Sequence, residues 1–215
     1  MRELKARYKF YFSNREFIII TLEAFSILIL SIIANFYTAL YASERASNYV
    51  TDIILSNISV YDVDGIFVYG PLIMWTLVIF LCLHKPSRIP FTLKSIALFV
   101  LIRSVFTSLT HISPFPDQII INPESFINYF SSGADLFFSG HTGLPFLLSL
   151  IFWDNIYLRI LFFATSIMFG IVVLLGHLHY SIDVLSAFFI TYAIFHIALK
   201  LFKKDREIFF SELEK

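Results

Sequence analysis

The feature that most constrains the fold is a series of long apolar runs, each bounded by charged or turn-forming residues. A helix that crosses the roughly 30 Å hydrocarbon core of a bilayer needs about 20 apolar residues, because its backbone polar groups must be satisfied within the helix. The fourth run is the shortest of six. They lie at 17–40, 66–84, 93–112, 141–153, 156–176 and 180–202. We therefore predict an all-α polytopic membrane protein in which residues 1–215 form one bundle of six transmembrane helices.

The composition supports a membrane-embedded chain. Of the 215 residues, 58% are hydrophobic and 15% are charged, whereas a soluble domain carries roughly 25% charged residues. The 26 Phe and 11 Tyr residues suit lipid contact and interfacial belts. The single cysteine, Cys82, lies inside an apolar run, so no intrachain disulfide can form. We expect the membrane as a partner and no nucleic acid, and the oligomeric state stays open.

Lys and Arg are distributed unevenly between the loops. Basic residues gather before the first run, between the second and third, after the fourth and after the sixth, whereas the opposite loops carry only Arg45. By the positive-inside rule, both termini are cytoplasmic. The fourth and sixth runs then begin on the outer side. We therefore expect the segments before them, at 113–140 and 177–180, to face the exoplasm, the periplasm or a lumen.

Three ionisable groups stand where these two runs begin: His141, His179 and Asp183. His179 and Asp183 are four residues apart, so on a helix they share a face with Cβ atoms about 6 Å apart. The carboxylate can hold one imidazole nitrogen and leave the other as a nucleophile. His141 follows the small-residue turn Ser139-Gly140 at a helix start, where free N–H groups favour an anion. Because ionisable residues inside a membrane are costly, this pattern predicts a phosphate site and phosphoryl transfer through a phosphohistidine.

The same three residues allow a second interpretation, since two histidines and an aspartate can also form a zinc-ligand set. The Ser-Gly-His turn suits an oxyanion better than a metal, so we expect no metal and no cofactor. Arg103 stands near the middle of the third run, where an uncompensated cation costs several kcal/mol. It should face the substrate phosphate or, alternatively, pair with Glu23. The candidate substrate-binding residues are Arg103, Asp135, Ser139, Gly140 and Tyr180.

The remaining histidines have simpler interpretations. His84, His111 and His196 are expected to be hydrogen-bonded packing residues. His111 ends the third run on the outer side and is also a candidate for lining the site. His177 lies close to the expected nucleophile and is a candidate for a supporting role.

Two segments, 134–142 and 176–184, resemble the two catalytic motifs of the sphingomyelin synthase-like family, a branch of the type-2 phosphatidic acid phosphatase superfamily. A third segment, 103–116, is similar to a further motif of that family. The resemblance implies six helices and an exoplasmic or lumenal His-His-Asp site. It also implies transfer of a phospho-headgroup from a glycerophospholipid to a lipid alcohol such as ceramide, with release of diacylglycerol.

The resemblance assigns a role to each residue of the triad. His179 would be the nucleophile, Asp183 its orienting carboxylate and His141 the acid/base partner. The wider superfamily carries a Lys-rich first motif ending in Arg-Pro and an arginine several residues before its second histidine. The first motif is not visible in this sequence, and residues 170–178 contain no arginine. These departures disfavour an ordinary phosphomonoesterase.

The charges of the outer loops favour a phosphodiester substrate. The 113–140 loop contains three acids and no Lys or Arg, and the first loop adds Asp52, Asp62 and Asp64. Such loops repel a phosphomonoester dianion. A zwitterionic headgroup presents one phosphate charge and an ammonium that acidic and aromatic side chains can hold.

We therefore predict headgroup transfer from a phosphatidylcholine or phosphatidylethanolamine donor to a lipid alcohol acceptor such as ceramide. One alternative is a lipid phosphatase or phospholipase C-type hydrolase, in which water is the acceptor. The other is a non-catalytic lipid-binding or transport protein.

Overall fold

The chain folds as a helical bundle. The computed structural model describes residues 2–119 and 136–211, and its regular elements in these ranges are all helices. The α-helices are α1 (Arg2–Phe12), α2 (Arg15–Arg45), α3 (Asp64–His84), α4 (Ile89–Leu109), α5 (Gly140–Ile151), α6 (Ile156–Leu175), α7 (Ser181–Leu201) and α8 (Lys203–Phe210). Two short 3₁₀ turns, η1 (Leu55–Asn57) and η2 (Pro86–Arg88), lie between them.

Five of the described helices are long and apolar enough to cross a membrane: α2, α3, α4 together with η2, α6 and α7. The prediction of an all-helical integral membrane protein is thereby confirmed for the described residues. The fourth predicted span, 141–153, corresponds to α5, which has 12 residues. At 1.5 Å per residue α5 is about 18 Å long, which is less than the roughly 30 Å of a hydrocarbon core. A sixth complete span therefore stays a prediction.

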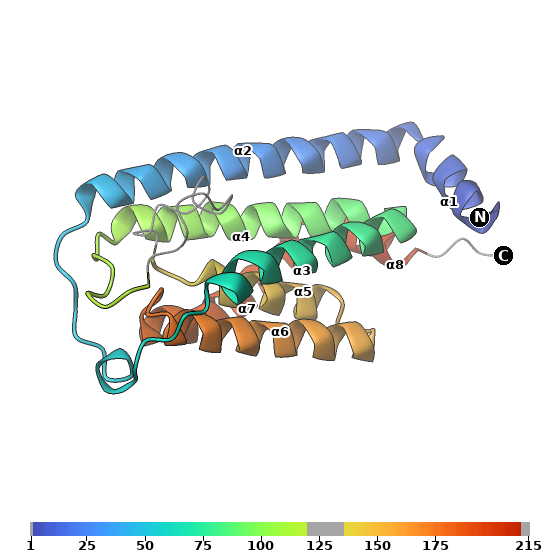
Figure 1. Cartoon of the computed structure of the whole chain (residues 1–215). Coiled ribbons are helices and arrows are strands. Elements are labelled where there is room, and N and C mark those ends of the chain that lie inside the picture. The colour runs from blue at the N-terminus through green and yellow to red at the C-terminus, as the bar shows by residue number, and fades with distance from the viewer. Residues whose placement is uncertain (1, 120–135, 212–215) are drawn as a thin grey trace.

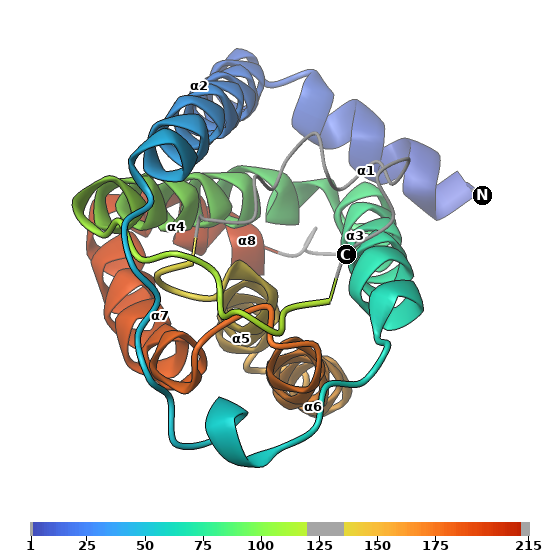
Figure 2. The same cartoon turned by 60° about the vertical axis from the view of Figure 1, so that its left-hand side comes forward.

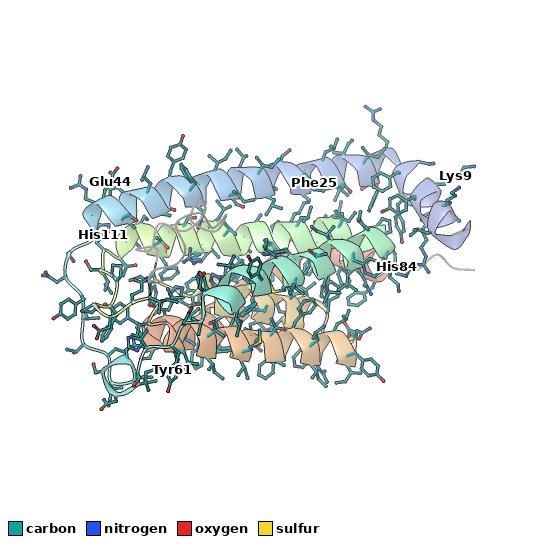
Figure 3. The ribbon with its side chains drawn as sticks, viewed as in Figure 1. Lys9, Phe25, Glu44, Tyr61, His84 and His111 are labelled. Atoms are coloured by element: carbon teal, nitrogen blue, oxygen red, sulfur yellow. The ribbon has the colours of Figure 1, made fainter. Side chains whose placement is uncertain are left out.

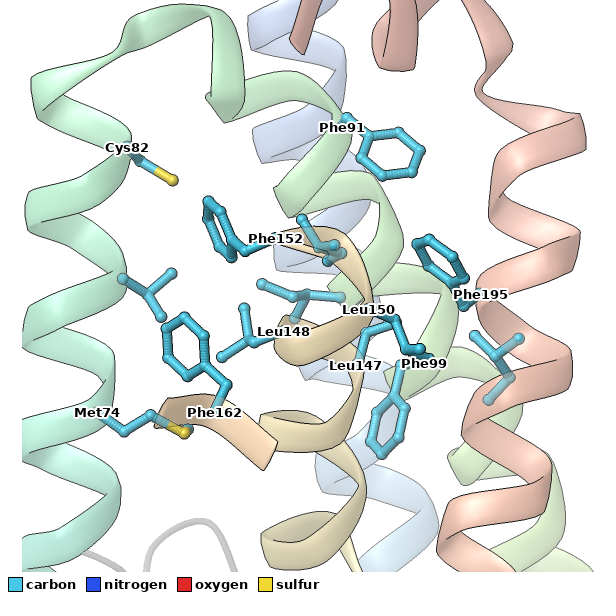
Figure 4. Packing of buried hydrophobic residues seen from close by; sticks show 14 of the residues in the cluster. Met74, Cys82, Phe91, Phe99, Leu147, Leu148, Leu150, Phe152, Phe162 and Phe195 are labelled. Atoms are coloured by element: carbon cyan, nitrogen blue, oxygen red, sulfur yellow. The ribbon is translucent and has the colours of Figure 1, made fainter. Parts of the chain in front are cut away.

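The short helix α5 lies in the middle of the bundle and is surrounded by protein. Viewed along the bundle, α4, α6 and α7 lie around it (Figure 2). Its apolar side chains form the centre of the main hydrophobic core, together with aromatic side chains of the neighbouring helices (Figure 4). Leu147, Leu148 and Ile151 are completely buried. Gly143 allows α5 to approach its neighbours, since a Cβ atom there would lie 2.7 Å from the Phe99 ring.

The two ends of the bundle differ in their contents. The terminal helices α1 and α8 and the η2 turn lie at one end, and the loops 46–63 and 110–119 lie at the other (Figure 1). His84 and His111 lie at these opposite ends (Figure 3). The shared end of α1 and α8 agrees with the prediction that both termini lie on one side, but the orientation of the bundle in a membrane stays a prediction.

An ion cluster joins three helices at the α8 end, where Lys94 and Asp205 are buried and the Glu23 side chain is 55% exposed. The Lys94 ammonium lies 3.0 Å from the Glu23 carboxylate and 3.2 Å from that of Asp205. The alternative that Glu23 pairs with Arg103 is therefore not what the structure shows. Glu23 and Arg103 are at different levels of the bundle. The guanidinium group of Arg103 instead faces Asn35 of α2, whose Oδ1 atom lies 3.4 Å from Arg103 Nη1.

Candidate active site

The turns that begin α5 and α7 lie side by side, which brings the two histidine motifs together. The backbone N–H of Ser139, just before α5, donates to the carbonyl oxygen of Asp183 in the first turn of α7 at 3.1 Å. His141 is the second residue of α5 and lies within electrostatic range of both His179 and Arg103. The structure thus gathers all three predicted catalytic residues and the predicted cation in one place.

His179 and Asp183 form a buried pair. The His179 Nδ1 atom lies 3.4 Å from Asp183 Oδ2, and the two side chains are 8% and 1% exposed. The same Oδ2 atom accepts the backbone N–H of Tyr180 at 2.9 Å, which fixes the carboxylate on its own helix. If the proton is assigned to Nδ1, the Nε2 atom keeps its lone pair. The arrangement therefore suits a nucleophilic imidazole oriented by a carboxylate.

A tight turn sets the position of His179. At the end of α6 the N–H of Leu178 donates to the Val173 carbonyl at 2.8 Å, and that of His177 donates to the Leu174 carbonyl at 3.0 Å. This is the Schellman pattern, in which the residue after the cap adopts a left-handed conformation and is usually glycine. Here it is His177, with φ 52°. The His177 ring is 2% exposed and packs edge-on against Phe115, and among the described residues its ring nitrogens have no hydrogen-bond partner. The supporting role considered for His177 stays a prediction.

The His141 ring is held between aromatic side chains. It stacks on the Phe67 ring of α3, with centroids 4.1 Å apart and planes inclined by 21°, and it meets Phe169 of α6 edge-on. This orientation depends on side chains from two other helices, which the sequence motif alone does not identify.

Ser139 caps α5 and fixes its first turn. Its Oγ atom accepts hydrogen bonds from the N–H and the hydroxyl of Thr142 at 3.3 and 3.2 Å, and Ser166 of α6 donates to the Thr142 carbonyl at 2.7 Å. The N–H groups of Gly140 and His141 lie in this turn and have no acceptor within the helix. They are available to an anion.

Arg103 of α4 lies directly against this turn. Its Nε–H donates to the carbonyl oxygen of Phe138 at 2.8 Å, and the side chain is mostly buried. A Cβ atom on Gly140 would lie 3.5 Å from Nε, so the guanidinium group and the start of α5 are neighbours. Asn35 of α2 completes its surroundings. Sequence reasoning missed Asn35, whose only signal was a polar residue inside an apolar run.

Asp52 caps α7 from the first loop. Its Oδ2 atom accepts the N–H and the hydroxyl of Ser181 at 2.7 and 2.8 Å, although the two residues are 129 positions apart. Its Oδ1 atom accepts the N–H groups of Ile54 and Leu55 at 2.8 and 3.1 Å. Burial acts to raise the pKa of the Asp52 carboxyl, but these hydrogen bonds outweigh it and hold the pKa below its ordinary value. We expected Asp52 to attract a substrate ammonium. In the structure, Asp52 instead holds the start of α7.

Tyr180 joins the loops 46–63 and 110–119. Its hydroxyl donates to the Ser113 carbonyl at 2.8 Å and accepts the Val50 N–H at 3.4 Å, and its side chain is almost completely buried. A contact between Tyr180 and substrate stays a prediction. Asp135, the other outer-loop candidate, lies outside the described residues.

These contacts change one expectation about the phosphate site. We expected the N-termini of both outward-starting helices to attract the phosphate, but carboxylates already accept the first N–H groups at α7. Asp183 accepts from Tyr180 and Asp52 accepts from Ser181. The start of α5, beside Arg103, remains as the candidate anion site, and phosphate binding there stays a prediction.

An apolar cavity of about 720 Å³ opens from this anion site between α2, α3, α4 and α5. Arg103, Asn35 and Gly140 line one of its ends. The His, Cys, Asp and Glu side chains of residues 2–119 and 136–211 form no group of three that could hold a metal ion. Catalysis without a metal stays a prediction.

Comparison with known proteins identifies the family that this site resembles. Residues 133–200 match the family model described as PAP2 superfamily C-terminal. The match contains both histidine motifs and supports the type-2 phosphatidic acid phosphatase superfamily, whose members are phosphatases and phosphotransferases. No curated protein and no solved structure matches the chain. The PAP2 match thus supports an enzyme with lipid phosphatase or phosphotransferase-type activity, in accord with the His179–Asp183 pair.

Proposed function

We propose that the protein is a phospholipid headgroup phosphotransferase that works through a phosphohistidine on His179. One observation carries the proposal: a buried histidine–carboxylate pair lies beside an anion site that continues into an apolar cavity. A phospholipid has the matching shape, with a phosphate at one end and apolar chains beyond it. A soluble phosphate ester has no use for the apolar part.

In the first step, His179 Nε2 attacks the phosphorus of the donor. The bond between phosphorus and the diacylglycerol oxygen breaks, and protonated His141 gives that oxygen a proton. Asp183 stabilises the positive charge that develops on His179. Arg103 and the first N–H groups of α5 hold the phosphate oxygens, where charge increases in the transition state.

In the second step, neutral His141 removes the proton from an acceptor hydroxyl, whose oxygen attacks the phosphohistidine. The P–N bond breaks, and His179 regains its lone pair. A lipid alcohol such as ceramide is the proposed acceptor. The burial of His179 supports transfer over hydrolysis, because it limits the access of water to the intermediate.

The charge of the site supports a phosphodiester donor. Arg103 is the cation that interacts with His141 in the described part of the chain, and α5 supplies one helix N-terminus. His141 is charged only while it carries the proton of the first step, so Arg103 is the permanent cation among these groups. One permanent cation and one partial positive charge suit a monoanionic phosphodiester, whereas a phosphomonoester dianion would favour more cations. Phosphatidylcholine and phosphatidylethanolamine meet this requirement.

The test uses purified protein in mixed micelles with headgroup-labelled phosphatidylcholine or phosphatidylethanolamine, each with and without ceramide. Labelled ceramide product, together with diacylglycerol that appears only when ceramide is present, supports the proposal. Free phospho-alcohol without an acceptor would instead identify a hydrolase. No product from either donor would refute the proposed chemistry.

Two variants test the mechanism in the same assay. His179→Ala should abolish turnover, and Asp183→Asn should lower kcat by about two to four orders of magnitude, because the imidazole loses its orienting anion. His196→Ala is the matched control, since His196 is on the same helix and packs against the Tyr192 ring. Activity should also survive EDTA and a zinc-selective chelator, and an acid-labile, base-stable adduct should be trapped on His179. Restoration of a lost activity by one particular metal would exclude this mechanism.

We further propose that the site faces the exoplasm, the periplasm or a lumen. The support is the basic character of the opposite end, which carries α1, η2 and α8. Asn57 and Ser13 are exposed at opposite ends of the bundle. In a Cys82→Ala background, a cysteine at position 57 should react with an impermeant thiol reagent added to sealed cells, whereas one at position 13 should not. The opposite labelling pattern would reverse the orientation.

A further inference from the structure

We propose that the cavity between α2, α3, α4 and α5 binds one acyl chain of the lipid substrate, and that its end beside Cys82 limits the length of that chain. The proposal rests on the proposed function, because it assigns part of the donor lipid to a place in the structure. It adds a specificity determinant that lies away from the histidines.

The cavity has a polar end and a long apolar part. Arg103, Asn35 and Gly140 belong to the anion site, so a phosphate bound there places the lipid chains at the mouth of the cavity. The other lining side chains are apolar apart from the thiol of Cys82. Examples are Leu28 of α2, Val78 of α3, and Leu93 and Val100 of α4. Such a lining suits a hydrocarbon chain and offers little to a polar group.

The cavity is long enough to hold one acyl chain. Its lining on α4 runs from Arg103 to Ile89, which corresponds to about 21 Å at 1.5 Å per residue. The chains of one leaflet fill about half of a hydrocarbon core that is roughly 30 Å thick, or about 15 Å. The volume of about 720 Å³ is in the range of sites that hold one drug-sized ligand, about 300–1,000 Å³. These dimensions suit one chain of a diacyl lipid.

The far end of the cavity is formed where the polypeptide turns from α3 into α4. Cys82 and Leu83 on α3 and Ile89 on α4 line that end, and η2 connects the two helices there. The hydroxyl of Tyr8 on α1 donates to the Leu83 carbonyl at 2.9 Å, which ties the terminal helix to the same place. An acyl chain that reaches this end meets the connection between α3 and α4 and the contact of Tyr8 with Leu83.

The side of the cavity is open between α2 and α3. The lining residues Phe36 of α2 and Ile79 of α3 are 50% and 58% exposed, whereas Ile96 and Phe99 on the inner wall are buried. α2 packs along α4, while α3 contacts α6 and η2. In a bilayer this opening would face lipid chains, so a substrate chain can enter sideways while its headgroup approaches Arg103.

Cys82 supplies a reporter at the far end. It is the single cysteine of the chain, and its side chain points from α3 into the bundle (Figure 4). We would measure the rate of Cys82 alkylation by N-ethylmaleimide in the His179→Ala protein, so that no turnover occurs. The probes are micelles that contain octanoyl, lauroyl or palmitoyl phosphatidylcholine. Palmitoyl chains should slow alkylation at least tenfold, and octanoyl chains should leave the rate as in detergent alone.

A second measurement uses activity. Leu93→Trp fills the far half of the cavity and should lower kcat/KM at least tenfold for a palmitoyl donor relative to an octanoyl donor. Leu101→Trp is the matched control, because Leu101 is on the same helix, is 37% exposed and lies outside the lining. It should leave that ratio unchanged.

The outcomes separate this proposal from the proposed function. The acyl-chain site would be overturned if Cys82 alkylation did not depend on acyl-chain length, even if headgroup transfer occurs. Constant protection by another occupant, such as a second copy of the protein, would be one such result. Chain-length-dependent protection of Cys82 without any transfer would support the site and refute the transferase. An unchanged palmitoyl-to-octanoyl ratio in Leu93→Trp would also contradict the proposal.

Discussion

Removal of the Asp52 carboxylate should lower catalysis although Asp52 is on a different segment from the histidines. Asp52→Ala deletes four hydrogen bonds, two of them to Ser181 at 2.7 and 2.8 Å. Hydrogen bonds to a charged group are worth about 1.5–3 kcal/mol each and are not additive, so we expect the start of α7 to lose roughly 3 kcal/mol. Ser181 lies two residues from both His179 and Asp183. Because a misplacement of about 1 Å can cost about 10²-fold in rate, kcat should fall about 100-fold with little change in KM.

Graded variants sharpen this prediction. Asp52→Asn retains one acceptor oxygen but replaces the other with an NH2 group, which cannot accept a hydrogen bond. Its kcat should therefore lie between those of wild type and Asp52→Ala. Ser181→Ala removes only the hydroxyl bond and should lower kcat a few-fold. Asp62→Asn is the control for loop charge, since Asp62 is exposed and its Oδ1 atom accepts only the local Asp64 N–H, at 3.1 Å, among the described residues.

The assay is steady-state transfer from labelled donor to ceramide in micelles, with thermal unfolding measured on the same samples. The pKa of Asp52 is held below its ordinary value of 3.8, so its stabilising contribution is present above about pH 4 and is lost as the pH falls through the folded-state pKa. The difference in stability between wild type and Asp52→Asn should therefore shrink below that pH. A wild-type kcat with a raised KM in Asp52→Ala would refute the reasoning, because it would mean that Asp52 contacts the headgroup.

Three further predictions concern packing, charge and backbone conformation, each measured by thermal unfolding in detergent. Gly143→Ala should destabilise the protein by about 1–3 kcal/mol, because its Cβ would overlap the Phe99 ring. Gly65→Ala is the control and should not destabilise it, since nothing lies within 4 Å of a Cβ there. Equal effects would contradict the close approach of α5. Lys94→Met should cost about 3–5 kcal/mol by leaving a buried carboxylate unpaired, and adding Asp205→Leu should recover much of the loss. His177→Val should be less stable than His177→Gly by about 1–2 kcal/mol, since a φ of 52° disfavours a β-branched residue; a Val variant as stable as the Gly variant would argue against the left-handed turn.

Local sequence patterns predicted the main helices well. The runs at 66–84, 156–176 and 180–202 correspond closely to α3, α6 and α7, because apolar length and turn residues define such helices. The terminal helices α1 and α8 were not predicted, since they are short and rich in charges. α5 was predicted as a span because its apolar run continues into Phe152 and Trp153, but the helix ends at Ile151.

The candidate site was predictable where its geometry is local and not where it depends on distant segments. The contact between His179 and Asp183 is local, because the two residues are four positions apart. It does not form along one helix face as we expected, since His179 lies in the turn before α7 and only Asp183 is on the helix. The capping of α7 by Asp52 and the contact of Arg103 with Asn35 join residues far apart in the chain. The sequence alone does not distinguish an aspartate in a loop that caps a helix from an aspartate that faces solvent. Tertiary packing decides between them.

The shortness of α5 has an electrostatic consequence. Its last carbonyl group, on Ile151, accepts a hydrogen bond at 2.8 Å from Arg206 of α8, and its first turn lies against Arg103. Both ends of the helix dipole are thus enclosed by protein, where the effective dielectric constant is lower than in water. A full-length span would carry its ends into hydrated headgroups, and water would weaken the field there. With its negative end neutralised by Arg206, α5 presents a weakly screened positive end to the place where we propose that a phosphate meets His179.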